Sequence, residues 1–342
     1  MLAKLKTVLD DFHIGMSYDS PARRSNLSFV TAPEGAIEAH NIAACKPVID
    51  AVSVGDFVGA VQHIHAVDAG REFSPTGTPL RSIATYFLTQ QIVSEMQFRE
   101  RNEQRLPYYR AWAQQNPDCP FAVSAYAEAL ASTGYSYRGT GLAKDVAAEQ
   151  WQTLQAYATE AEAVMSRSWE KFQHHYAWTH SYLKLALVSQ RPLGEHMSRF
   201  QMAMNAAPMD PVIYSTLCCH LLPRWFGSFE LIGQVAAECA DATHTHWGQT
   251  AYAIIYDELL DWHGAEEFGV DYDRLRTGYM DWHQRFPHDY MRVRLASYAV
   301  AHDDLTTCLD QLEALQVFYE DAWACDDDVL LVNALCRART GR

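Results

Sequence analysis

The sequence predicts an all-α protein in which antiparallel helical hairpins stack side by side as a tetratricopeptide-like α-solenoid. Three observations support this fold class. Apolar residues recur at alternating steps of three and four through most of the chain after residue 82, which is the period of one helix face. A proline stop recurs at Asn116-Pro117, Ala207-Pro208 and Phe286-Pro287. No strands alternate with the helices, as a parallel sheet would require.

One hairpin can be followed completely between Tyr176 and Pro211. A helix is expected over 176–189, a turn at Arg191-Pro192, and a second helix over 193–205 that stops before Pro208. This unit is about 34 residues long, which is the repeat length of helical-hairpin arrays. Such arrays usually offer extended surfaces to other macromolecules.

The chain is predicted to divide into an irregular N-terminal cap, residues 1–81, and a helical-repeat domain, residues 82–342. Within the cap, two short helices separated by Gly55 are expected between Val48 and Val67. The segment Asn26–Ala32 is the only candidate strand, because it is the one short run rich in apolar and β-branched residues.

Helices follow one another almost without interruption in the repeat domain. The clearest covers 142–166, where one apolar stripe contains Ala147, Trp151, Leu154, Ala158, Ala161 and Met165. Further helices are expected over 107–115, 120–134, 212–222, 228–241, 247–263, 271–285, 289–302, 304–317 and 328–339. Breaks are expected at Gly134, Gly227, Gly264 and His288.

Composition limits the kinds of partner. The formal net charge of −15 argues against a nucleic-acid or anionic membrane surface. No apolar run approaches the roughly 20 residues needed to span a bilayer, and no signal peptide is expected at Met1–Leu9. Eight cysteines lie scattered without a C-x-x-C pair, which indicates free thiols in a reducing cytoplasm.

An acidic run late in the chain is the strongest charge feature. Residues 303–328 contain no Lys or Arg and nine acidic residues: Asp303, Asp304, Asp310, Glu313, Glu320, Asp321, Asp326, Asp327 and Asp328. A run of this kind is commonly just a solvated face. Here Phe318, Tyr319 and Trp323 are interleaved with the acids, and a mixture of aromatic and charged residues is typical of an interface.

Two turns between helices carry an arginine beside glycine. One is Tyr137-Arg138-Gly139-Thr140-Gly141, and the other runs from Leu222 through Arg224 and Trp225 to Ser228. A guanidinium offers five donors and can stack on aromatic rings. The two arginines are expected either to tie loop carbonyls together or to form an anion site. Trp225 is expected to be mostly buried, and Ser228 to cap the helix that begins at Phe229.

These segments also carry a resemblance. The run from Trp112 through YRGTG, the helix over 142–166, AAPMDP and LPRWFGS resembles a bacterial family, domain of unknown function 4034. The resemblance covers about residues 107–256, and its sharpest parts are Arg138-Gly139 and Pro223–Ser228; Phe226 stands where the family pattern has glycine. It implies a helical, tetratricopeptide-like architecture and a bacterial source. It implies no reaction.

A search for chemistry finds no complete catalytic or metal set. The pairs His63/His65 and His244/His246 have no Asp, Glu or Cys placed to complete a recognised metal site. Ser181-x-x-Lys184 matches a short acyl-enzyme pattern, but its companion motifs are absent. There is no phosphate-binding glycine loop and no nucleophile elbow. No metal ion or cofactor is therefore expected.

The sequence favours a non-catalytic helical-repeat protein that binds a basic protein partner, as a toxin-neutralising immunity protein or a secretion-associated protein would. The expected contact residues are Arg138, Arg224, Trp225, Phe318, Tyr319, Trp323, Asp326, Asp327 and Asp328. The alternative is an enzyme or small-molecule receptor with an anion site at Arg138 and Arg224. The sequence does not indicate the oligomeric state.

Overall fold

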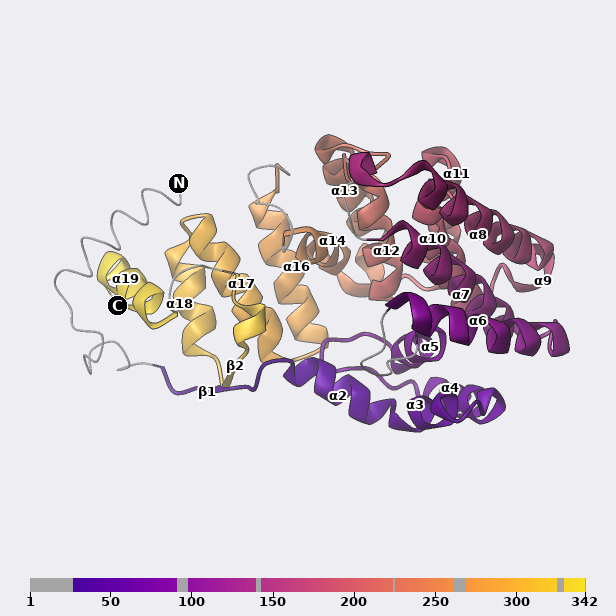
Figure 1. Ribbon diagram of the computed structural model, residues 1–342. Helices are drawn as coiled ribbons and strands as arrows, with labels where there is room; N and C mark the ends of the chain where they lie inside the picture. Colours follow the sequence, from indigo (N-terminus) through magenta and orange to yellow (C-terminus); the bar gives the residue numbers. More distant parts are fainter. Residues whose placement is uncertain are drawn as a thin grey trace. The chain divides into compact units, whose positions relative to one another are not determined.

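The computed structural model describes residues 27–90, 98–139, 143–223, 225–260, 269–324 and 329–341 (Figure 1). The all-α prediction is confirmed, because these segments are helices joined by turns apart from two strands of two residues each. None of the described helices is both long and apolar enough to cross a membrane.

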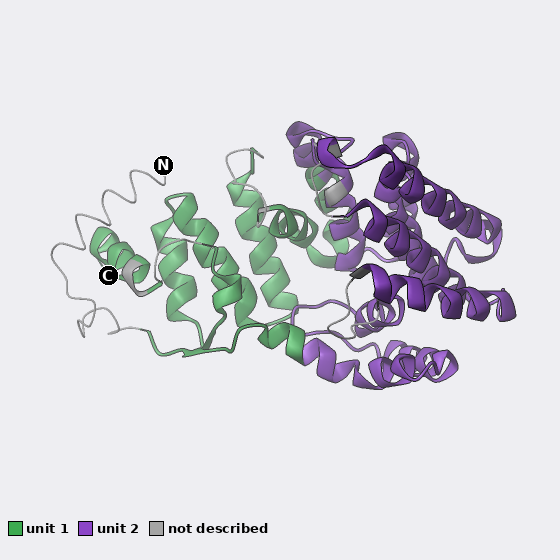
Figure 2. Cartoon of the chain, in the orientation of Figure 1, with its two compact units in different colours: residues 1–39, 236–342 green, residues 40–235 purple. Residues whose placement is uncertain are grey.

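The chain divides into two compact units (Figure 2). Unit 1 comprises residues 1–39 and 236–342, and unit 2 comprises residues 40–235. The dividing points lie within helix α2 (Ala36–Ala44) and helix α13 (Phe229–Trp247). The boundary predicted at residue 81 lies within unit 2.

In its described residues, unit 2 consists of helices and the 3-10 turn η2 (Ala143–Asp145). The predicted pair of short helices around Gly55 is confirmed, and Gly55 has the positive φ of 78° that this turn requires. The helices are α3 (Lys46–Ser53), α4 (Phe57–Gly70), α5 (Leu80–Gln90), α6 (Phe98–Gln115), α7 (Pro120–Arg138), α8 (Ala148–Arg167), α9 (Trp169–Phe172), α10 (Tyr176–Val188), α11 (Leu193–Ala206) and α12 (Pro211–Leu221).

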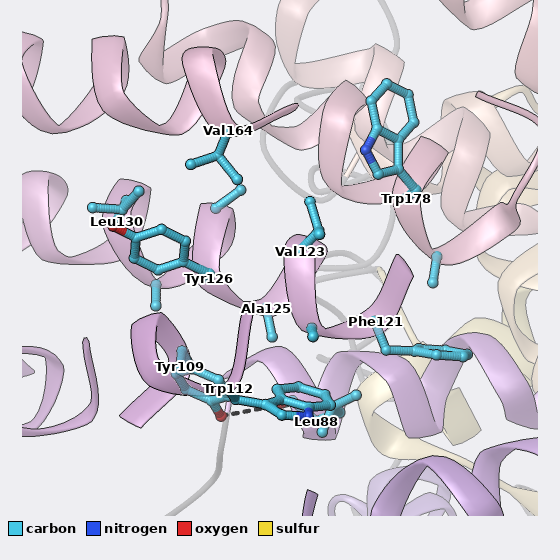
Figure 3. Close-up of a cluster of buried hydrophobic side chains, with 14 of the residues drawn as sticks. Leu88, Tyr109, Trp112, Phe121, Val123, Ala125, Tyr126, Leu130, Val164 and Trp178 are labelled. Carbon is cyan, nitrogen blue, oxygen red and sulfur yellow. Dashed lines mark hydrogen bonds between the residues drawn. The ribbon is translucent and has the colours of Figure 1, made fainter. Parts of the chain in front are cut away.

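Helix α7 is the centre of unit 2 and packs against α5, α6, α8 and α10. Fifteen of its 19 residues are buried, and many of them are alanines that allow neighbouring helices to approach closely. The predicted break at Gly134 is wrong, since α7 continues to Arg138. A Cβ atom at Gly134 would lie 2.8 Å from the Tyr157 Cβ of α8, so this glycine serves helix packing. Figure 3 shows the core around α7.

Unit 1 contains the C-terminal part of α13 followed by α14 (Thr250–Leu260), α16 (Tyr272–Arg285), α17 (Asp289–Ala301), α18 (Leu305–Glu313), the 3-10 turn η3 (Glu320–Ala322) and α19 (Val329–Thr340). Among these described helices, α14 packs against α16, α16 against α17, α17 against α18 and α18 against α19. Asp304 caps α18, because its carboxylate accepts the Thr307 N–H at 3.1 Å.

The N-terminal segment of unit 1 joins its C-terminal part through a small parallel sheet. Strand β1 (Val30–Thr31) pairs with β2 (Val317–Phe318), with Val30 opposite Val317. The candidate strand predicted within Asn26–Ala32 is thus confirmed at two residues. The helix predicted over 304–317 ends earlier, at Glu313, because its last residues pair with β1 instead.

Candidate functional site

The acidic segment of unit 1 has one apolar side and one charged side. Seven of its residues are buried in the unit 1 core: Leu305, Cys308, Leu309, Leu312, Leu315, Phe318 and Ala322. Five of its acidic residues are exposed, and we call them the acidic face: Asp303, Asp310, Glu313, Glu320 and Asp321. Asp326, Asp327 and Asp328 lie outside the described residues.

The three aromatic residues of this segment differ in exposure. Phe318 is only 5% exposed, and its ring stacks on Phe29 with ring centroids 5.1 Å apart. Phe318 is therefore a core residue that holds β2 against the N-terminal segment. Tyr319 and Trp323 are partly exposed. The Tyr319 hydroxyl lies 3.0 Å from His288 Nε2, which fixes the ring beside α17.

Arg138 is the last residue of α7 and is 8% exposed. Its Nη1 donates to the Gly139 carbonyl at 2.9 Å, and its guanidinium lies 5.1 Å from the Trp151 ring. Gln150 ties the same turn together, since its Nε2 donates to the Tyr137 carbonyl at 2.9 Å. These contacts favour the first of the two roles predicted for Arg138, that of tying the turn together.

The second arginine turn lies between α12 and α13. Arg224 falls outside the described residues, and Trp225 is partly buried. Ser228 caps α13 as predicted, because its hydroxyl accepts the Leu231 N–H at 3.1 Å. Gly227 is required for close packing, since a Cβ there would lie 2.0 Å from the Leu221 carbonyl oxygen. The Phe226 ring stacks on His220 at 4.6 Å.

Two polar clusters of unit 2 contain residue types used in nucleophilic catalysis. Their geometry differs from that of a catalytic serine–lysine pair or a serine–histidine–acid triad. Ser181 Oγ donates to Glu128 Oε1 at 2.5 Å, and Lys184 Nζ lies 3.5 Å from Glu128 Oε2. The serine and lysine of the Ser-x-x-Lys pattern therefore share a buried carboxylate. A lysine occupied in this way is not set up as a base for the serine.

The second cluster contains Ser82, His180 and Asp210, all nine-tenths or more buried. Ser82 Oγ donates to Asp210 Oδ2 at 2.8 Å, and His180 Nε2 lies 3.2 Å from the same oxygen. A catalytic triad needs the histidine between the serine and the acid, whereas here the acid lies between the other two. This arrangement anchors α5 and α10 to the turn before α12.

The charge of Asp210 is held in place by these neighbours. Burial alone would raise the pKa of Asp210, but His180, the Ser82 hydroxyl and the Val212 N–H together hold the pKa of this carboxyl below its usual value. Asp210 is therefore an ionised carboxylate inside unit 2.

A polar cavity of about 270 Å³ lies beside this cluster, between α4, α5, α10, α11 and α12. Its polar wall includes Asp68, Arg81, His175 and His180, and its apolar wall consists of Ala203, Ala206, Ala207 and Ile213. Sequence reasoning missed this site, because its residues come from five helices and form no local motif.

The histidine pair His244/His246 lies in the last turn of α13, and both side chains are exposed. They line an open hollow of about 410 Å³ together with Asp281 and Arg285. Residues two apart on a helix point in different directions. Among the residues that the structure describes, no three His, Cys, Asp or Glu side chains are grouped to hold a metal ion.

No family model matches this chain, and neither the curated proteins nor the solved structures include a match. The resemblance to domain of unknown function 4034 thus stays a prediction from its motifs.

Proposed function

We propose that this protein is a non-catalytic helical-repeat protein that binds a basic protein partner through unit 1. One observation carries the proposal: residues 236–342 contain 20 acidic and eight basic residues, which gives them a net charge of −12 out of −15 for the whole chain. Charge concentrated in one unit steers a partner of opposite sign and accelerates encounter.

The acidic face gives this charge a defined surface. Its carboxylates stand opposite the buried side of α18 and η3, and the partly exposed rings of Tyr319 and Trp323 lie in the same segment. In a protein interface, charges at the rim mainly raise the association rate, while desolvated aromatic residues hold the complex. Phe318 supports the segment from inside rather than touching the partner.

The order of helix contacts in unit 1 supports the solenoid part of the proposal. Among the described helices of unit 1, α14, α16, α17, α18 and α19 make their most extensive helix contacts with their neighbours along the chain. Tetratricopeptide-like arrays are built from helices that pack in this way. The family resemblance and the charge together favour a bacterial toxin-neutralising or secretion-associated role. Buried free cysteines such as Cys45, Cys239 and Cys336 support a reducing, cytoplasmic location.

The alternative, an anion site at Arg138 and Arg224, has less support. The Arg138 guanidinium is already engaged by the Gly139 carbonyl and by the rings of Tyr135 and Trp151. A guanidinium held in this way braces a turn, so we favour the binding surface on unit 1.

The test compares partner retention between charge variants. The acidic-face variant carries Asp310→Asn, Glu313→Gln, Glu320→Gln and Asp321→Asn. A control variant with the same change in net charge carries four exposed substitutions in unit 2: Asp145→Asn, Glu149→Gln, Glu170→Gln and Glu230→Gln. Wild-type protein immobilised in a lysate of its source organism should retain a basic protein at low salt.

The retained partner is then purified for kinetics. Its association rate should fall as salt rises, and the acidic-face variant should lower it by roughly tenfold at low salt, while the control stays near wild type. A further variant, Asp326→Asn with Asp327→Asn and Asp328→Asn, extends the comparison along the acidic run. Equal rates for both four-site variants, or no retained basic protein, would refute the proposal.

A further inference from the structure

The polar cavity of unit 2 contains buried polar atoms that the surrounding protein leaves unpaired. Arg81 Nε and His175 Nδ1 make no hydrogen bond with the described residues, although their solvent exposure is close to zero. Nearly all buried polar atoms in folded proteins have a hydrogen-bond partner. Two such atoms on residues that line one cavity therefore indicate that the partner belongs inside the cavity.

Contacts with Asp68 and Tyr176 hold the Arg81 guanidinium in position, but its Nε–H donor has no partner in the described part of the chain. Its Nη1 pairs with Asp68 Oδ1 at 2.8 Å, and its guanidinium lies 4.6 Å above the ring of Tyr176. Because the guanidinium is planar and rigid, these contacts also fix the direction in which its Nε–H points. A guanidinium edge is the group that proteins most often use to recognise a carboxylate.

His175 supplies a second polar group on the same wall. Burial lowers the pKa of His175 to about 4, so the ring is neutral at physiological pH. A neutral imidazole can donate from one nitrogen. Its edge-on contact with Phe121, at 5.1 Å between ring centroids, holds the ring in place.

The charges around the cavity select for a ligand with one negative charge. The Arg81 guanidinium disfavours a cation at the wall where its Nε lies, and the carboxylates of Asp68 and Asp210 repel a doubly charged anion. The opposite wall is made of three alanines and Ile213, which suits a short aliphatic chain. A volume of about 270 Å³ is small for a ligand pocket.

We propose that this cavity binds a small aliphatic monocarboxylate, whose carboxylate accepts hydrogen bonds from Arg81 and His175 while its chain packs against Ala203, Ala206 and Ile213. The exposed residues His174 and Ala206 give the ligand a path from the surface. Two sources share this chemistry, a short-chain fatty acid and the α-carboxylate of an aliphatic amino acid. The site is separate from the acidic face, so it does not depend on the function proposed above.

The experiment is calorimetric titration of the full chain with four probes: butyrate, L-valine, inorganic phosphate and butylamine. Butyrate or L-valine should bind at concentrations up to about 10 mM, and phosphate and butylamine should not. Binding of butyrate alone identifies the fatty-acid source, and preferred binding of L-valine identifies the amino-acid source. In parallel, the imidazole NMR signals of His175 should shift on ligand addition.

Two variants place the binding in the cavity. Arg81→Met should weaken carboxylate binding roughly ten- to hundredfold, and its partner Asp68 can be hydrated because its side chain is 36% exposed. Ala206→Phe should abolish binding by filling the cavity from an exposed helix position. The matched control is Asn205→Phe on the adjacent, exposed position of α11, which does not line the cavity.

Three outcomes would overturn the proposal. The first is that neither carboxylate binds, and the second is that phosphate or butylamine binds as well as they do. The third is that Ala206→Phe and Asn205→Phe bind the carboxylate equally, which would put the site elsewhere.

Discussion

Unit 2 should lose stability on mild acidification because of a buried histidine pair. His196 and His220 are both 0% exposed, and their rings stack with centroids 4.1 Å apart. Neither ring nitrogen of His196 has a hydrogen-bond partner among the described residues. Burial, with the nearby Arg191 guanidinium, lowers the pKa of His196 to about 3 and that of His220 to about 4.

The sign of the effect follows from these directions. In the unfolded chain a histidine titrates near pH 6.5, so at about pH 5.5 most unfolded molecules carry two extra protons that the folded state excludes. The free energy of unfolding of unit 2 is therefore highest above pH 6.5, and it falls as the pH drops toward the pKa values of the two rings in the folded state. One pH unit below 6.5 costs about 1.4 kcal/mol per ring, or roughly 3 kcal/mol for the pair.

The assay is urea unfolding at about pH 7.5 and pH 5.5, followed by amide hydrogen exchange in α11 and α12. The double variant His196→Phe with His220→Phe removes both titrations and keeps two stacked rings. It should lose about 3 kcal/mol less than the wild type between the two pH values. Residual loss is expected from His175, whose pKa burial also lowers to about 4.

The exposed His63 provides the control, since His63→Gln replaces a histidine and leaves the buried pair intact. If wild type and double variant lose equal stability between the two pH values, the rings are accessible to protons in the folded state. The reasoning from burial would then be wrong.

Two other predictions concern helix packing, and a third concerns a buried ion pair. Gly134→Ala should destabilise unit 2 by about 1–3 kcal/mol in thermal unfolding, because its Cβ would crowd the Tyr157 Cβ. Gly194→Ala on α11, where nothing lies within 4 Å of the added Cβ, should instead stabilise the protein by about 0.5–1 kcal/mol. Arg294 is 1% exposed, and its Nε lies 2.6 Å from Asp257 Oδ1. Asp257→Asn removes this counter-charge and should lower the free energy of unfolding of unit 1 in urea by about 3–5 kcal/mol. A cost below about 1 kcal/mol would contradict this.

Local signals in the sequence predicted local structure well. The helices on either side of Gly55 and the Ser228 cap depend on residues adjacent in the sequence, so both could be predicted without knowledge of the fold. The helix break predicted at Gly134 was wrong, because the sequence does not distinguish a glycine needed for close helix packing from one that ends a helix. The end of α18 at Glu313 was missed, since it depends on a strand partner far away in the chain.

The features of the candidate sites that could not be predicted depend on contacts between residues far apart in the sequence. Phe318 has the composition context of an interface residue, yet its ring is covered by Phe29 from the N-terminal segment. The cavity needs Arg81, His175 and Ala206 together, and no spacing along the chain reports that they meet. Arg138 could be assigned two roles from sequence, and only its contacts with Gly139 and Trp151 favour the structural one.

The pairing of β1 with β2 also has a consequence for synthesis on the ribosome. Val30 leaves the ribosome early, but its partner Val317 emerges only after all of unit 2 has been made. At about 5–20 residues per second, that delay is on the order of 15–60 s. Unit 2 can complete its core in this interval, whereas β1 of unit 1 cannot pair until Val317 has emerged. A chain truncated after α17 should therefore retain a folded unit 2 and leave β1 and Phe29 without their partners.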